Sequence, residues 1–365
     1  MSGATCVAGS GKKVGRAGDT CLATHCNNDT LDSGETSVDC GGECGCRATF
    51  EIVSYKPVLS GVAHLQAMSR DGKRFGGYNF RSKAGYPAAI AYDGTVAELE
   101  SYGTTGRVYA ASSDGSVLGG NISCANPPSC TTATPTNVRW SGSAAPTLLG
   151  SDGTLGAISS SGSIFAGVVD DGAGSQNAFL STTTQRIVIA ELKSMAALTP
   201  DGQYVAGDHK DGVHGGLWFA QTQVTTKIGA SNWTSTTISG ANGTDPAVIG
   251  HGYISASDST IGFRWKGGAI TELGLLTGGV YTMPYAVSSD GSTVVGLTGS
   301  NSFQQAFIWT DSNKLRTIVD ELKARGLEPA VDLALPSADF MSDDGKTIVG
   351  NLPTSPPTFW RAVLE

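Results

Sequence analysis

The sequence predicts an all-β protein: a seven-bladed β-propeller behind a small disulfide-rich segment. Three observations lead there. A short turn phrase recurs seven times at intervals of 40 to 54 residues, the range of propeller blades. Glycine accounts for 50 of 365 residues, about twice its usual share. Charged residues make up only 15%. We therefore expect a Cys-rich, disulfide-stapled spacer module over residues 1–47 and the propeller over 48–365.

The repeated phrase is Ser-x-Asp-Gly followed by a β-branched run, in which a further glycine is expected to close the strand. Asp-Gly favours tight hairpins because glycine adopts positive φ at little cost. A degenerate copy lies at 239–243. The turn glycines are Gly72, Gly115, Gly162, Gly202, Gly243, Gly291 and Gly345, and the strand-closing glycines are Gly76, Gly119, Gly167, Gly207, Gly250, Gly296 and Gly350.

Each copy continues with an aromatic run and a final short run, so four strands per repeat are expected. One strand position carries Trp140, Trp218, Trp265, Trp309 and Trp360, which predicts packing between blades. The last copy stops after three strands, and residues 49–57 read as a lone strand before the first copy. We expect that strand to complete the last blade and remove two open edges. A helix over 313–326 is predicted, with Gly326 at its C-terminal cap.

The cysteines divide the chain, because six of the eight lie in the first 46 residues. An even number clustered in a short stretch is typical of a disulfide framework in an oxidising compartment. Zinc binding by the close thiols at 40–46 stays open as an alternative, as does the disulfide connectivity. The start of the chain lacks the charged and apolar regions of a signal peptide, which we expect to have been removed. The cysteines are Cys6, Cys21, Cys26, Cys40, Cys44, Cys46, Cys124 and Cys130.

The run Glu-Thr-Ser-Val-Asp-Cys-Gly-Gly at 35–42 resembles an ETDVDCGG motif of bacterial surface proteins and lipoproteins, with Ser37 where that motif has Asp. Its hard oxygen ligands could bind calcium, although the register is not that of an EF-hand and a solvated acidic loop is the simpler interpretation. No cofactor is expected to be required. The candidate ligands are Asp29, Asp32, Glu35 and Asp39.

The repeats resemble the HAF family of bacterial extracellular repeat proteins. The match is best at 286–296, where Ala-Val-Ser-Ser-Asp-Gly-Ser-Thr-Val-Val-Gly precedes Ala306-Phe-Ile-Trp309. Gln305 and Asn177 stand where His is common in that family. The resemblance implies a secreted or cell-surface location and no particular chemistry.

Candidate site residues are few. Asp208, His209, Asp211 and His214 could hold a divalent ion, although such a run is usually a polar loop. The repeated aspartates are expected to serve turn geometry. Variable loops between second and third strands, and between blades, should share one face that binds ligand. Asn126, Trp233 and Tyr281 are our candidates on that face, with Trp233 and Tyr281 expected in exposed connections.

We therefore expect a secreted or cell-surface binding, adhesion or structural module that is not an enzyme. Its ligand would be a polysaccharide or another surface protein. A glycosidase or lyase acting on polysaccharide is one alternative, and paired carboxylates in a central cleft would favour it. Self-assembly by exchange of strand 48–57 is another. The net charge of −8 argues against nucleic acid, and no apolar stretch is long enough to cross a membrane.

Overall fold

The computed structural model describes residues 48–57, 61–81, 84–101, 105–123, 135–142, 145–182, 184–327 and 334–364. All eight cysteines lie outside these residues, as do Asn126 and the acidic candidates Asp29, Asp32, Glu35 and Asp39. The predictions made for them therefore remain predictions.

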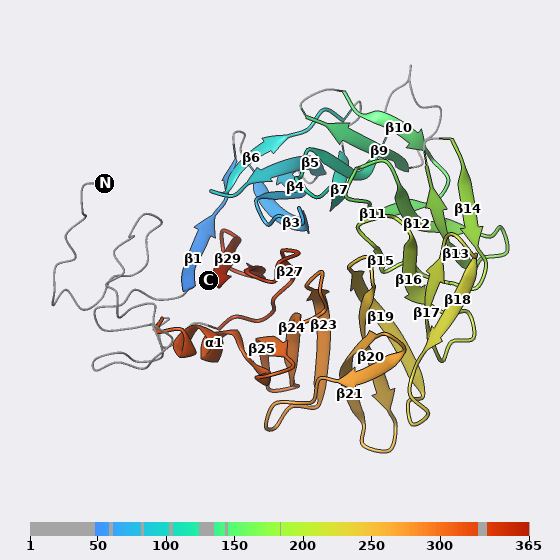
Figure 1. Ribbon diagram of the computed structural model, residues 1–365. Helices are drawn as coiled ribbons and strands as arrows, with labels where there is room; N and C mark the ends of the chain where they lie inside the picture. The colour runs from blue at the N-terminus through green and yellow to red at the C-terminus, as the bar shows by residue number, and fades with distance from the viewer. Residues whose placement is uncertain are drawn as a thin grey trace, which may run out of the picture.

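The described strands form antiparallel groups of four that follow one another around a ring (Figure 1). The first group contains β3 (Val62–Met68), β4 (Arg74–Arg81), β5 (Ala84–Ala91) and β6 (Thr95–Glu98). The second contains β7 (Thr105–Ala111), β8 (Val117–Ser123), β9 (Pro135–Ser141) and β10 (Thr147–Gly150). The third contains β11 (Thr154–Ile158), β12 (Phe165–Asp170), β13 (Gln176–Ser181) and β14 (Arg186–Ile189). The fourth contains β15 (Ala197–Leu198), β16 (Tyr204–Asp208), β17 (Gly215–Phe219) and β18 (Val224–Ile228).

The remaining groups complete the ring. The fifth contains β19 (Ser235–Asn242), β20 (Ala247–Ile254), β21 (Ser259–Lys266) and β22 (Ala269–Glu272). The sixth contains β23 (Tyr281–Val287), β24 (Thr293–Ser300), β25 (Phe303–Thr310) and β26 (Lys314–Thr317), and one parallel pairing joins it to the fifth. The last contains β27 (Phe340–Met341), β28 (Thr347–Leu352), β29 (Thr358–Leu364) and β1 (Ala48–Ser54). The first strand of each group faces the centre of the ring, which is the architecture of a β-propeller (Figure 1).

The two ends of the described chain close the ring. Strand β1 pairs antiparallel with β29 along its whole length, from Ala48 opposite Leu364 to Ser54 opposite Thr358, as the sequence predicted. The next strand, β2 (Lys56–Pro57), then pairs in parallel with β6 of the first group. One continuous segment thus joins the last group to the first, and both edges it covers are removed from solvent pairing.

The repeated turn has one hydrogen-bonding pattern, clear at the sixth group. The Ser288 hydroxyl donates to the Asp290 carboxylate at 2.6 Å and accepts the Thr293 N–H at 3.0 Å. The same carboxylate accepts the Ser292 N–H at 2.9 Å, and Gly291 has φ of +72°. Equivalent bonds hold the turns at Asp71, Asp114, Asp201 and Asp344. The structural role predicted for these aspartates is confirmed.

The second glycine of each repeat does not close its strand, contrary to the prediction. It lies inside the second strand of each group. A Cβ at Gly296 would lie against the Met283 carbonyl oxygen on one side and the Phe307 ring on the other. A Cβ at Gly250 would meet a carbonyl oxygen and a phenylalanine ring in the same way. The cause is a β-bulge in the adjacent first strand, which brings its carbonyl toward the second strand.

The prediction of a helix over 313–326 was wrong for the first turn. Residues 314–317 form β26, because they pair with β25 and cover its open edge. Helix α1 (Ile318–Ala324) begins after Thr317, whose hydroxyl caps it by accepting the Asp320 N–H at 3.0 Å. Arg325 is the C-cap, and Gly326 follows with φ of +78°. No helix among the described residues is long and apolar enough to cross a bilayer.

The five repeated tryptophans do not all share one position, which corrects the prediction. Trp218, Trp265 and Trp309 pair with Val205, Val248 and Val294, each two residues before the mid-strand glycine of the partner strand. Trp140 pairs with Leu118, two residues before Gly120. Trp360 instead pairs with Gly350, as Phe307 pairs with Gly296. The tryptophans are buried except for Trp265, which is half-buried.

Candidate binding site in the central channel

A channel of about 240 Å³ lies at the centre of the ring, and the first strands of all the groups contribute to it. Ten of its 23 lining residues are alanine or glycine, and its polar side chains are few. The lining residues are 66–68, 70, 109–111, 156–158, 196–198, 239–242, 285–287, 340, 341 and 343.

Bulges aim the polar side chains into this channel. The register shifts between Leu65 and Ala67, so Gln66 is the extra residue; Tyr109, Ser239 and Tyr285 occupy the same place in their own strands. A bulge leaves its extra residue unpaired in the ladder and re-aims its side chain. All four line the channel, and the Gln66 side-chain oxygen is buried with no hydrogen-bond partner among the described residues.

Arg70 crosses the channel at the end where the repeated turns lie. Its guanidinium donates to Asn242 Oδ1 at 2.9 Å and to the Leu198 carbonyl at 3.2 Å, and its Nη1 lies 3.6 Å from Asp343 Oδ1. Asn242 in turn donates to Asp343 at 2.9 Å and to the Val287 carbonyl at 2.9 Å. The one carboxylate among the lining residues, Asp343, is therefore already engaged twice.

The backbone explains why these side chains are placed there. Backbone bonds link neighbouring turns around most of the ring: Asp343 N–H to the Arg70 carbonyl at 2.7 Å, Asp71 N–H to Ser113 at 3.0 Å, and Ser160 N–H to Pro200 at 2.8 Å. Pro200 has no N–H to continue the series. At that break the Arg70 and Asn242 side chains make the connections instead, so the degenerate fifth repeat supplies an asparagine that the ring uses.

The channel contains four neutral hydrogen-bonding side chains, and the ion pair of Arg70 with Asp343 lies at its turn end. Burial lowers the pKa of the Arg70 guanidinium, and the neighbouring Asp343 carboxylate opposes that shift. Burial raises the pKa of the Tyr285 hydroxyl, with Asp339 adding to the effect, so the hydroxyl stays protonated. Neither Arg70 nor the bulge residues were singled out from sequence. The sequence did hold one sign of this site. Arg70 is the only long side chain at the second position of the Ser-x-Asp-Gly phrase.

The structure gathers three of the four predicted metal ligands around one carboxylate oxygen. Asp211 Oδ2 lies 2.8 Å from His214 Nδ1, 3.1 Å from His209 Nδ1 and 2.9 Å from Lys227 Nζ. Burial alone would raise the pKa of Asp211, but the His214 N–H and Lys227 outweigh it and lower that pKa. Asp208 turns away and accepts the Ile238 N–H at 2.9 Å. The described part of the chain contains no group of three or more His, Cys, Asp or Glu side chains arranged to hold a metal ion.

Two of the three ligand-face candidates lie within the described residues. Trp233 was expected to be exposed, but its side chain is only 4% exposed, because the ring packs 5.0 Å from Phe263 and covers Gly252. Tyr281 is half-buried at the start of β23, and its hydroxyl donates to the Ser300 carbonyl at 3.2 Å. The predicted face therefore offers Tyr281 but not the Trp233 ring to a ligand.

Comparison with known proteins supports the fold. No protein-family model matches the chain, and no curated protein matches it. Among solved structures, an oligogalacturonate lyase from Vibrio parahaemolyticus aligns with a TM-score of 0.56 at 10% identity, over 87% of this chain and 97% of that one. The β-propeller domain of Cps50 (Swd1) from Myceliophteria thermophila aligns with a TM-score of 0.52 at 11% identity, over 85% and 98%. The chain has a β-propeller fold.

A prolyl endopeptidase structure aligns with this propeller at a TM-score of 0.52 and 11% identity over 70% of the chain. The propeller spans only 43% of that longer protein. All three likenesses are at 10–11% identity and show the fold alone.

Proposed function

We propose that this protein is an extracellular, non-enzymatic binding protein whose seven-bladed propeller holds the end of a neutral glycan in its central channel. The observation that carries the proposal is the convergence of four neutral polar side chains, from bulges on four different first strands, on one narrow channel. Those side chains are Gln66, Tyr109, Ser239 and Tyr285.

The blade count rests on the strand groups. Six groups are continuous in sequence, and the seventh is completed by β1 from the N-terminal side. The strands that carry Gln66, Tyr109 and Tyr285 lose little freedom when a ligand binds, because backbone bonds between neighbouring turns already hold them. Resemblance to the HAF family and the clustered cysteines support an extracellular location.

The chemistry of the channel favours sugar hydroxyls. Each hydroxyl both donates and accepts, as do tyrosine, serine and glutamine side chains, while a tyrosine ring also packs against the apolar face of a sugar. The unpartnered Gln66 oxygen would gain a donor on binding, which removes a buried unsatisfied acceptor. At about 240 Å³ the channel is below the usual range of small-molecule pockets, so one terminal sugar is the expected occupant.

The carboxylates favour binding over hydrolysis. Most glycosidases act with a pair of carboxyl groups on either side of the scissile bond. Here Asp343 is held by Arg70 and Asn242 at the turn end of the channel, where it completes the frame. Because the Asp343 carboxylate is already bonded to Arg70 and Asn242, the channel is better suited to binding a glycan than to hydrolysing one.

A glycan array probed with the labelled full-length protein tests the proposal. We expect binding to neutral glycans, at least tenfold weaker in Tyr285→Ala. Tyr253→Ala is a matched control, because both tyrosines are 37% exposed but Tyr253 lies on β20 away from the channel, with its hydroxyl on Asp258. Equal binding by both variants, or the absence of neutral glycans among the ligands, would refute the channel site. Shortened glycans detected by mass spectrometry would show an enzyme instead.

A further inference from the structure

The third blade lacks the tryptophan that, in the second, fourth and sixth blades, fills the space against the preceding blade. Trp140, Trp218 and Trp309 are at most 2% exposed, and each packs in a cluster that includes residues of the preceding group. The Trp140 indole N–H also donates to the Glu100 carbonyl, in the connection between the first and second groups, at 2.7 Å. The indole is thus a wedge between two blades.

In the third group the same position is Ser181. Gly167 pairs with Phe179 as Gly296 pairs with Phe307, and two residues before that glycine Phe165 pairs with Ser181 as Val294 pairs with Trp309. The serine therefore stands where an indole would lie. In the seventh blade, Ala362 is equally small, but α1 supplies Ile318 and Leu322 to the same cluster.

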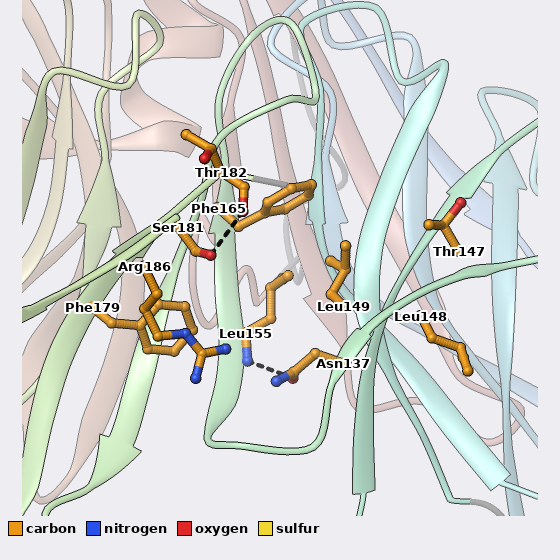
Figure 2. Close-up of a pocket in the computed structure, with 10 residues that line it drawn as sticks. All are labelled: Asn137, Thr147, Leu148, Leu149, Leu155, Phe165, Phe179, Ser181, Thr182 and Arg186. Carbon is orange, nitrogen blue, oxygen red and sulfur yellow. Dashed lines mark hydrogen bonds between the residues drawn. The ribbon is translucent and has the colours of Figure 1, made fainter. Parts of the chain in front are cut away.

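The missing indole leaves a cavity of about 190 Å³ between the second and third blades (Figure 2). Leu149, Leu155, Phe165 and Phe179 form its apolar walls, and Leu155, Phe165 and Phe179 are each only 2% exposed. The rim is open to solvent at Thr147, Leu148 and Thr182, so a ligand has a way in.

The rim also carries a positive charge. The Arg186 guanidinium lies over the Phe179 ring, 4.4 Å from its centroid (Figure 2). It donates one of its five N–H groups to the Asp152 carbonyl at 3.1 Å. The Ser181 hydroxyl faces the same space and donates to the Thr182 carbonyl at 3.0 Å. An aromatic ring in the cavity would therefore place a substituent beside a cation and a hydroxyl.

We propose that this cavity, which we call the Ser181 cavity, binds a small aromatic carboxylate with a ring the size of indole. Apolar cavities of about 150 Å³ take up benzene from water, so a cavity lined by two phenylalanines and two leucines suits a planar ring. The carboxylate pairs with Arg186, whose planar guanidinium matches a carboxylate in geometry. This site is independent of the central channel and does not rest on the proposed glycan function.

Calorimetric titration of the full-length protein with indole-3-carboxylate, indole and cyclohexanecarboxylate tests the proposal. We expect one site for indole-3-carboxylate, several-fold weaker binding of indole, and at least tenfold weaker binding of the non-aromatic acid. Ser181→Trp should abolish binding by filling the cavity, while Ser163→Trp, on an exposed turn, should not change it. Arg186→Gln should reduce the affinity for indole-3-carboxylate to that for indole.

Trp218→Ser provides the converse test, because it should open an equivalent cavity between the third and fourth blades and raise the stoichiometry for indole from one to two. Thr225 stands there in the place of Arg186, so the second site should bind indole-3-carboxylate no more tightly than indole. If that variant does not fold, Ser181→Trp decides alone. The proposal is overturned if the wild-type protein shows no saturable binding, or if Ser181→Trp binds as the wild type does.

Discussion

Arg70 and Asn242 meet at the centre of the ring although 172 residues separate them, with Nη1 of the arginine 2.9 Å from Oδ1 of the asparagine. Arg70 belongs to the first strand group and Asn242 to the fifth. Together they reach Leu198 in the fourth group and Asp343 in the last. Two side chains thus join the first, fourth, fifth and last groups at the centre of the ring.

Replacing Asn242 should therefore weaken the whole ring. Asn242→Leu removes the acceptor for Arg70 and the donor for Asp343, and we expect it to lower the free energy of unfolding by about 2–3 kcal/mol. Asn301→Leu, on an exposed turn, should change it by less than about 0.5 kcal/mol. Urea unfolding followed by circular dichroism measures both values. Equal stability of the two variants would contradict the role assigned to Asn242.

Glycines in tight turns, whether or not they belong to the repeated turns, should tolerate a side chain only where space permits. Gly268 and Gly291 both have positive φ, +86° and +72°, but a Cβ at Gly268 meets nothing within 4 Å, whereas at Gly291 it lies 2.7 Å from the Ala247 side chain. Gly268→Ala should cost about 1 kcal/mol from backbone strain alone. Gly291→Ala should cost about 3 kcal/mol because overpacking between blades adds to the strain. Denaturant midpoints compare them, and a larger loss at Gly268 would refute this account.

Acidification should destabilise the fold through His251. Burial lowers the pKa of His251 below its usual 6.5, although Asp208 partly opposes this, and its Nδ1 is buried without a partner among the described residues. The unfolded chain therefore takes up the proton first, so stability is highest above pH 6.5 and falls as the pH drops from there toward the folded-state pKa. His64, whose pKa burial also lowers, adds to the slope.

Melting temperatures between about pH 5 and 8 measure this dependence. His251→Gln should show a shallower fall than the wild type across that window, with the remainder carried by His64. A wild-type protein that becomes more stable on acidification below pH 6.5 would show that the assigned direction is wrong.

The disulfide prediction requires that all the cysteines are oxidised. The eight cysteines are an even number, and their clustering is typical of a disulfide framework. Titration with Ellman's reagent in denaturant should find no free thiol before reduction and eight after it. Free thiols before reduction, together with bound zinc in elemental analysis, would favour the zinc alternative.

Sequence reasoning succeeded where the signal is local. The Ser-x-Asp-Gly turns could be predicted because Ser288, Asp290 and Gly291 bond to one another and to the next few residues. The pairing of β1 with β29 followed from counting strands and from the cost of open edges. Most of the fold could therefore be predicted from the repeat.

It failed where a distant partner decides the outcome. The apolar spacing at 315–322 is compatible with a helix, but pairing of Leu315 with Trp309 made its first part a strand. Trp233 read as a loop residue, yet Phe263 and Gly252 bury it. Ser181 looked like an ordinary strand residue until the register showed that it stands in the place of a tryptophan. The channel likewise depends on bulges, which the sequence does not mark directly.

The central claim, a glycan site built from the bulge residues, is tested most directly by calorimetric titration of the best neutral oligosaccharide from the array. Wild-type protein and Tyr253→Ala should bind with equal affinity, while Gln66→Ala and Tyr285→Ala should each bind at least tenfold more weakly with unchanged melting temperatures. Undiminished affinity in both channel variants would contradict the claim.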